Sequence, residues 1–212
     1  WSMEARIARA RRVHHHAAMR IATWNVNSVR ARLPRLVPWL EANSPDVVCL
    51  QETKVVDEQF PRQYLEDVGY DVVVHGQKTY NGVAILARRS IRDVVRGFPG
   101  DGEDAQARAI AATVDGWRIL NLYVPNGAEV GHEKYRMKLA WLERLRAYLD
   151  ADFDATDRLV VCGDFNVTFD DRDVYDPDEW REKILCSTPE RDALRNVMDF
   201  GLVDALRVHH EE

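Results

Sequence analysis

The middle of the chain is a series of short apolar stretches separated by turn residues. Each stretch has the length and the β-branched content of a strand, and turns are marked by Asn81-Gly82, Pro99-Gly100-Asp101-Gly102 and Asp115-Gly116. The expected strands are 71–75, 82–88, 92–96, 107–114 and 117–124. So many consecutive, antiparallel-looking strands favour a core between two sheets.

A helical segment, 34–42, lies between strands early in the chain, which indicates the α/β class. Pro34 suits the first turn of a helix, because its missing N–H would have no partner there. Pro38 would remove an interior hydrogen bond, which favours a helix start nearer Leu36.

Two longer helices are expected in the second half, at 132–150 and 189–200. The first carries a large apolar residue at every fourth position, which predicts a face that packs on the core: Met137, Trp141, Leu145 and Leu149. The second begins at Pro189 and ends before Gly201, in agreement with the usual helix punctuation.

The apolar run 159–162 stops on Gly163-Asp164-Phe165-Asn166. Side chains two positions apart on a strand share a face, so Asp164 and Asn166 can address one ligand. Gly163 has no side chain to block a substrate. Aspartate and asparagine are also common turn formers, so this segment alone is equally consistent with a simple turn.

Three further strands end in polar groups. The run 21–27 closes with Asn25 and Asn27, and the run 47–54 delivers Glu52 with Lys54 close behind. The strand 117–124 ends at Tyr123, with Asn126 just beyond. One such strand would be explained by capping, but four together predict a site at one rim of a sheet.

Composition fits one soluble domain. The 212 residues are 46% hydrophobic, and no apolar run approaches the ~20 residues of a membrane span. Cys49 and Cys162 lie in apolar runs and are expected to be small buried side chains, and a reducing cytoplasm fits best. The net charge of −6 argues against tight, sequence-blind coating of DNA but not against a local basic patch.

Six motifs occur in order: Trp-Asn-Val-Asn-Ser-Val-Arg (24–30), Leu-Gln-Glu-Thr-Lys (50–54), His-Gly-Gln-Lys (75–78), Gly-Phe-Pro-Gly-Asp (97–101), Tyr-Val-Pro-Asn-Gly (123–127) and Gly-Asp-Phe-Asn (163–166). In this series the chain resembles the exonuclease III family of abasic-site endonucleases, within the deoxyribonuclease I-like endonuclease/exonuclease/phosphatase superfamily. The resemblance spans Met19 to Glu212. It implies a four-layered α/β-sandwich, with two mixed sheets inside and helices outside.

The resemblance also implies hydrolysis of DNA phosphodiester bonds in base excision repair, by an abasic-site endonuclease with 3′→5′ exonuclease and 3′-phosphodiesterase activity. The expected cofactor is Mg²⁺, which needs few protein carboxylates, with Mn²⁺ as the alternative. Glu52 is the expected metal ligand, with Asn25 in support. Asp164 is expected to deprotonate the attacking water, while Asn166 and Tyr123 donate to the phosphate. A capping role for Glu52 and a structural hydrogen bond for Tyr123 are the competing interpretations.

The expected contacts to DNA lie in the surrounding loops: Asn27, Lys54, Lys78, Tyr80 and Asn126. For Lys78 and Tyr80, an ordinary exposed loop is an equal alternative. The expected partner is double-stranded DNA that carries abasic sites or 3′ ends. The protein is expected to be a monomer that does not bind membranes.

The chain departs from the family pattern at both ends. Trp-Asp-Tyr and Ser-Asp-His segments, which carry an Asp–His pair and further strands in the family, do not occur before Glu212. We therefore expect a C-terminally truncated catalytic domain, 19–212, and an inactive fragment. Residues 1–18, with a His14-His15-His16 run, form a non-family extension: a transit peptide, a metal-binding tract, or translated upstream sequence. A catalytically dead binding protein and a small-ester phosphatase of the superfamily remain as alternatives.

Overall fold

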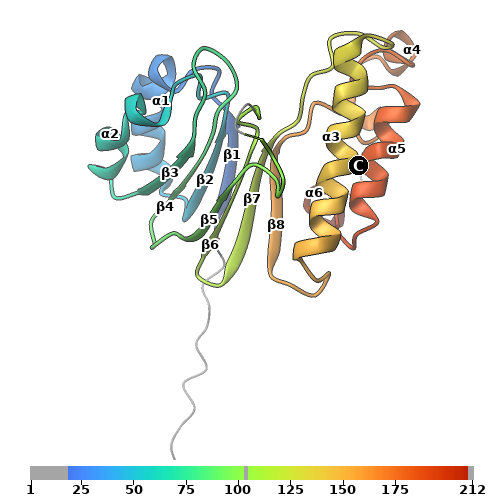
Figure 1. Ribbon diagram of the computed structural model, residues 1–212. Helices are drawn as coiled ribbons and strands as arrows, with labels where there is room; N and C mark the ends of the chain where they lie inside the picture. Colours follow the sequence, from blue (N-terminus) through green and yellow to red (C-terminus); the bar gives the residue numbers. More distant parts are fainter. Residues whose placement is uncertain (1–18, 103–104, 210–212) are drawn as a thin grey trace, which may run out of the picture.

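The computed structural model describes residues 19–102 and 105–209. Two four-stranded sheets stand face to face in its centre, and helices cover their outer sides (Figure 1). The expected four-layered α/β-sandwich with two mixed sheets is thereby confirmed. The extension expected at 1–18 lies outside the described residues.

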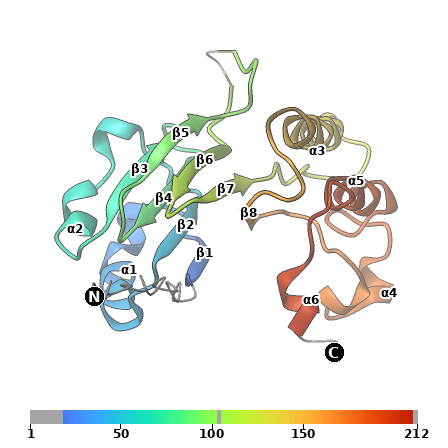
Figure 2. The ribbon, with the colours of Figure 1, turned by 90° about the horizontal axis from the view of Figure 1, so that it is seen from below.

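The first sheet carries α1 (Val29–Asn43) and α2 (Arg62–Glu66) on its outer face (Figure 2). Across the sheet its strands are β1 (Ile21–Asn25), β2 (Val47–Gln51), β4 (Val83–Ala87) and β3 (Asp71–His75). β1 and β2 are parallel, whereas β4 is antiparallel to both of its neighbours. The short 3-10 helix η1 (Asp57–Gln59) precedes α2.

The second sheet carries α3 (Glu133–Asp152) and α5 (Thr188–Met198) on its outer face. Its strands, in spatial order, are β5 (Arg92–Arg96), β6 (Ala109–Val114), β7 (Trp117–Tyr123) and β8 (Leu159–Asp164). Only β7 and β8 are parallel. Three short elements follow β8: η2 (Asp171–Asp173), α4 (Pro177–Trp180) and α6 (Ala205–His209).

Three apolar clusters bind these layers together. One lies under α1 and α2, one lies under α3 and α5, and the third fills the space between the two sheets. In the third cluster Cys49 is fully buried and Cys162 is partly buried, so both act as small apolar side chains. The adjacent Cys162 thiol and burial together raise the pKa of the Cys49 thiol.

The five strands predicted between 71 and 124 agree with the structure to within two residues at each end, and 71–75 and 92–96 coincide with β3 and β5. The predicted helix 189–200 begins one residue earlier, at Thr188, because Ser187 and Glu190 form a reciprocal cap. No helix in the described part of the chain is long and apolar enough to cross a membrane.

The predicted start of the first helix was wrong. The helix α1 begins at Val29, and both Pro34 and Pro38 lie inside it. The two prolines are four positions apart, so they share one helix face, and both are exposed. Water can therefore satisfy the carbonyls that the missing N–H groups leave free, which lowers the cost of each interruption.

The predicted core face of 132–150 was partly wrong. Leu145 and Leu149 are fully buried, but Met137 is 52% exposed. A spacing of four residues overshoots the 3.6-residue turn, so a stripe of three such steps rotates away from the core. The buried face begins instead with Tyr135 and Lys138.

A buried polar contact joins the two sheets next to the strand ends. Gln51 Nε2 on β2 donates to Asn121 Oδ1 on β7 at 2.7 Å, and both side chains are almost completely buried. Asn121 Nδ2 in turn donates to the carbonyl oxygens of Leu50 and Ala84, each at 2.9 Å. The contact fixes the position of β2, and thus of Glu52, against β7.

We expect Asn121→Leu to lower the free energy of unfolding by about 2–4 kcal/mol, because Gln51 Nε2 loses one of its three acceptors and two strand carbonyls lose their Asn121 donor. Urea unfolding measures this difference, with Asn196→Leu on the exposed side of α5 as the matched control. The double variant Gln51→Leu/Asn121→Leu should recover part of the loss. An Asn121→Leu protein as stable as the control would contradict the sheet-joining role.

Candidate active site

Four strand ends converge where the two sheets meet. Asn25 ends β1, Glu52 follows β2, Tyr123 ends β7 and Asp164 ends β8. Asn25 Nδ2 donates to Glu52 Oε1 at 2.7 Å and to Asp164 Oδ2 at 2.8 Å. One amide therefore bridges two carboxylates, one from each sheet. The predicted rim site is formed from both sheets together, rather than from one.

The orientation of Asn25 is fixed by its own loop. The backbone N–H of Asn27 donates to Asn25 Oδ1 at 3.1 Å, which leaves the amide nitrogen to face the carboxylates. Asp164 is held in a similar way, because the N–H of Asn166 donates to Asp164 Oδ1 at 3.1 Å. Asn25 and Asp164 therefore contribute their side chains to the site. The asparagine two positions after each of them orients that side chain through its backbone N–H.

The backbone around the site is strained. Glu52, Lys54, Asn27 and Asn166 all have a positive φ, between 43° and 55°. Such conformations cost of order 1 kcal/mol or more for each non-glycine residue, and they persist only where the surroundings enforce them. Here Ser28 N–H donates to the Glu52 carbonyl at 2.7 Å, which locks the two loops together.

Gly163 is required for strand pairing. A Cβ at this position would lie 2.0 Å from the carbonyl oxygen of Leu122 on β7. Its φ of +139° is also unfavourable for other residues. The glycine therefore lets β8 approach β7 closely enough to place Asp164 beside Tyr123, its partner in the strand register. The sequence had suggested open access for a substrate as the reason for this glycine.

The Glu52 carboxyl group has a lower pKa here than an ordinary glutamate. Burial alone would raise its pKa, but hydrogen bonds from Asn25, Lys54 and Tyr123 outweigh burial and lower the pKa below the usual glutamate value. Lys54 Nζ lies 2.8 Å from Glu52 Oε2 and also contacts Asn27 Oδ1. The carboxylate is therefore ionised at neutral pH.

Tyr123 has a raised pKa of about 12, caused first by burial and then by the negative charge and hydrogen bond of Glu52. Its hydroxyl is a neutral donor at physiological pH. Arg108, which the sequence analysis did not single out, stacks on the ring with its guanidinium 4.7 Å from the ring centroid. Arg108 Nη1 also donates to the Tyr123 carbonyl at 3.2 Å.

We expect the Tyr123 hydroxyl to titrate with a midpoint near pH 12, because burial and Glu52 both disfavour the phenolate. The difference in absorbance at the phenolate band between wild type and Tyr123→Phe isolates this one tyrosine. In a Glu52→Gln background the midpoint should fall toward the ordinary tyrosine value, since the nearby charge is gone. An unchanged midpoint would show that Glu52 does not act on Tyr123.

Asn126 and Asn166 face one another beside the four strand ends. Asn126 Nδ2 donates to Asn166 Oδ1 at 3.3 Å, and Asn166 Nδ2 donates to the Val124 carbonyl at 2.9 Å. The amide nitrogen of Asn166, which the sequence analysis assigned to a phosphate, is thus engaged with the backbone here. Asn126 is exposed.

Lys78 and Tyr80 lie in the loop between β3 and β4, at the same end of the first sheet as Glu52. Both side chains are exposed, Tyr80 by 68%. The Lys54 N–H donates to the Asn81 carbonyl at 2.9 Å, so the loop is attached to the site. The described contacts do not bring either side chain onto Glu52 or Asp164.

A comparison with models of protein families shows which family the chain belongs to. Residues 22–201 match the model of the endonuclease/exonuclease/phosphatase family. The chain belongs to this family. The matched range contains every candidate residue of the site, from Asn25 to Asn166.

Curated relatives narrow the relationship within the family. The chain is 37% identical over 200 residues to exodeoxyribonuclease III of Haemophilus influenzae, covering 89% of this chain and 75% of the relative. It is 29% identical over 196 residues to the DNA repair nuclease APEX1 of Danio rerio, covering 90% of this chain and 63% of that protein. The expected resemblance to exonuclease III-type enzymes is confirmed, as is the expectation of a nuclease.

Solved structures agree with this relationship. An AP endonuclease from Archaeoglobus fulgidus is 40% identical and superposes with a TM-score of 0.88, over 92% of this chain and 76% of that one. The 3′-5′ exonuclease NExo from Neisseria meningitidis is 44% identical, with a TM-score of 0.87 over the same shares of the two chains. Another structure of NExo, described as a 3′ phosphatase, is bound to a product DNA hairpin.

The donor set of this family member fits a hard divalent cation. Glu52 and Asp164 provide two carboxylates, and the described residues contain no group of three or more His, Cys, Asp or Glu side chains that could enclose a metal. Mg²⁺ is commonly held by one or two carboxylates and keeps several of its waters. An open hollow of about 530 Å³ adjoins Asn25 and Asp164 on the side of Gly163 and Leu185, and Glu52 does not line it.

Proposed function

We propose that this chain carries the catalytic residues of a Mg²⁺-dependent nuclease that cuts duplex DNA at abasic sites and removes nucleotides or blocking groups from 3′ ends. The observation that supports this most directly is the Asn25 amide that bridges Glu52 and Asp164. It brings together, within one polar site, an ionised carboxylate for a cation and a second carboxylate for a water.

Hydrolysis of a phosphodiester needs neutralised phosphoryl charge, an activated water and help for the leaving oxygen. A bound Mg²⁺ would supply charge neutralisation, and Glu52 would hold it. The Asn25 amide nitrogen orients the Glu52 carboxylate rather than offering an oxygen to the cation, so the expected supporting role of Asn25 is an indirect one. Asp164 accepts the proton of the water that attacks phosphorus, and its orientation is fixed by Asn25 and Asn166. Tyr123, whose raised pKa of about 12 keeps it protonated well into the alkaline range, donates its hydroxyl to a phosphate oxygen.

The DNA backbone is expected to lie along the exposed loops of the same rim. Phosphates would be contacted by Lys78, Tyr80, Asn27 and Asn126. Lys54 would join them when a DNA phosphate replaces its present contacts with Asn27 and Glu52. These contacts position the duplex without reading its sequence. We infer that the protein acts as a monomer, and the free cysteines fit a reducing compartment such as the cytoplasm.

A nicking assay tests the proposal. The whole protein that the gene encodes, and this 212-residue chain in parallel, are incubated with Mg²⁺ and a duplex that carries one abasic site. Parallel duplexes carry a 3′-hydroxyl or a 3′-phosphate, and a small phosphate diester serves as the non-DNA substrate. We expect chelator-sensitive cleavage at the abasic site by the encoded protein.

Each alternative has its own result. Cleavage of the small diester alone would favour a small-ester phosphatase, and DNA binding without cleavage would favour a dead binding protein. Activity of the 212-residue chain by itself would contradict the expectation that this chain is inactive. No cleavage of any substrate by the whole protein would refute the proposed function.

A further inference from the structure

A lysine is buried behind the site. Lys138 of α3 is fully buried, and its ammonium group donates to three acceptors: the carbonyl oxygen of Asn126 at 3.2 Å, the carbonyl oxygen of Asn166, and Glu190 Oε1. An ammonium group has three N–H donors, so its hydrogen-bonding capacity is used completely. The contact set is therefore specific.

Two of these acceptors belong to the loops that shape the site. Asn166 follows Asp164 by two residues, and its N–H orients the Asp164 carboxylate. Asn126 follows Tyr123 by three residues and contacts Asn166 through its side chain at 3.3 Å. The single ammonium group of Lys138 thus connects the backbone of the loop after β7 with the backbone of the loop after β8.

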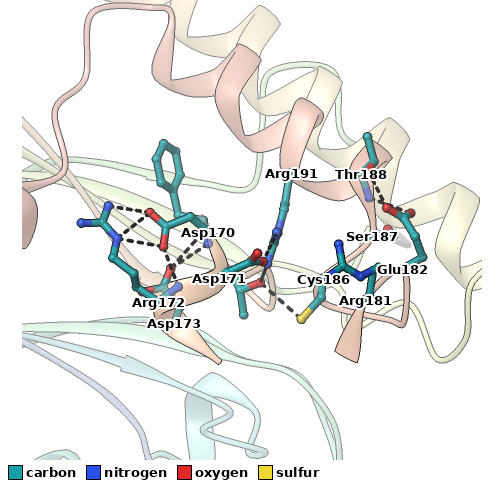
Figure 3. Close-up of polar contacts among 12 residues, drawn as sticks. Asp170, Asp171, Arg172, Asp173, Arg181, Glu182, Cys186, Ser187, Thr188 and Arg191 are labelled. Carbon is teal, nitrogen blue, oxygen red and sulfur yellow. Dashed lines mark hydrogen bonds and ion pairs between the residues drawn. The ribbon is translucent and has the colours of Figure 1, made fainter. Parts of the chain in front are cut away.

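The third acceptor is anchored on a different helix. Glu190 of α5 is fully buried and accepts hydrogen bonds from the Leu185 N–H, the Ser187 N–H and the Ser187 hydroxyl, the last at 2.6 Å. Figure 3 shows the segment before α5, where Glu182 binds Thr188 and Asp171 binds Arg191 at 2.7 Å. The carboxylate that holds Lys138 is therefore itself fixed.

Close packing leaves Lys138 little freedom to move. A Cβ at Gly127 would lie 3.2 Å from Lys138 Cδ and 2.9 Å from Ile184 Cδ1. The chain passes the lysine stem at this distance only because residue 127 is a glycine with a φ of +95°. Burial lowers the pKa of Lys138, and the negative charges of Glu190 and Asp164 oppose that effect.

We propose that Lys138 is a positioning residue, which holds the carbonyls of Asn126 and Asn166 so that both loops keep the geometry that Asp164 and the phosphate contacts require. This inference rests on the proposed function for its consequence, but the contact itself can be tested separately. The competing role is purely structural: Lys138 would only neutralise the buried Glu190.

The double variant Lys138→Met/Glu190→Gln separates the two roles. Removing one member of a buried ion pair strands the other charge, whereas a neutral pair of similar volume is commonly tolerated. The double variant should therefore fold. Lys134→Met, an exposed lysine one turn earlier on α3, is the matched control. Glu190→Gln alone is the second variant, because it keeps the lysine and both of its carbonyl contacts.

Hydrogen–deuterium exchange of the chain provides the readout that needs no activity. We expect amides in 124–129 and 165–168 to exchange about tenfold faster or more in the double variant, with wild-type rates in the two central strands β2 and β7. In the encoded protein, kcat should fall about 10–10²-fold with a much smaller change in KM, because displaced groups lose transition-state geometry. Glu190→Gln should retain most of kcat.

Wild-type exchange in both loops of a folded double variant would overturn the proposal and leave Lys138 as a charge partner for Glu190. Loss of exchange protection only in α5 would do the same. If the double variant does not fold, Lys138→Gln/Glu190→Gln, which replaces the ion pair by two neutral amides, takes its place: faster exchange in both loops supports the proposal, and wild-type exchange there overturns it. An inactive wild-type protein would refute the proposed function, while the exchange experiment would still decide the role of Lys138.

Discussion

Asp164→Asn is expected to lower kcat about 10²–10⁴-fold, the range that a positioned general base contributes. Asparagine keeps the size of the side chain, and its one amide oxygen can accept from either Asn25 Nδ2 or the Asn166 N–H, which bond to different oxygens of Asp164. It has no basic oxygen to accept the proton of the attacking water. KM for DNA should change little, because the residue acts on the water. Steady-state nicking of an abasic duplex by the encoded protein measures both constants.

The control for this variant is Asp71→Asn. Asp71 is exposed at the start of β3, at the end of the first sheet opposite to the site, and it undergoes the same chemical change. It should retain wild-type kcat. If Asp164→Asn retained activity within a few-fold of this control, Asp164 would not be the base.

Glu52→Gln has the second large expected effect. A cation that stabilises the transferring phosphoryl group contributes several kcal/mol, so loss of its main ligand should lower kcat/KM about 10³-fold. Calorimetric titration with Mg²⁺ should show affinity reduced about 10–100-fold or more, independently of activity. Glu143→Gln, exposed on α3, is the matched control. Undiminished Mg²⁺ affinity in Glu52→Gln would remove Glu52 from the metal site.

The same variant has a defined pH dependence of stability. The folded protein lowers the pKa of Glu52, so ionisation of this group stabilises the fold above the pKa of an unfolded glutamate. This contribution is lost as the pH falls through the lower, folded pKa. The difference in Tm between wild type and Glu52→Gln should therefore shrink on acidification. The contribution is small, because Glu52 and Lys54 are partly exposed.

Tertiary packing accounts for the predictions that failed. Pro34 and Pro38 argued against a helix from Val29, yet the exposed side of α1 tolerates both because water replaces the lost donors. Met137 was expected in the core because of its spacing, but the face of α3 that meets the second sheet passes through Lys138 instead. The local sequence pattern indicated a helix in both cases. The tertiary environment decided where α1 begins and which side of α3 is buried.

Some missed residues did leave a signal in the sequence. Asn121 is a polar position within an apolar strand, and Lys138 stands at helical spacing between Tyr135 and Leu142, both buried. A polar residue at a core position requires partners, so each predicts a buried contact. The partners could not be read from the chain, since Gln51 and Glu190 lie 70 and 52 residues away.

By itself the sequence determined the alternation of strands and helices, the polar residues at four strand ends, and the family motifs that contain them. These depend on local periodicity and on the order of residues along the chain. The tertiary structure decided that the four ends form one site, because Asn25 and Asp164 are 139 residues apart and meet only where β1 and β8 bring the two sheets together. Long-range packing also set the lowered pKa of Glu52, the raised pKa of Tyr123 and the burial of Lys138, since each depends on neighbours that folding supplies.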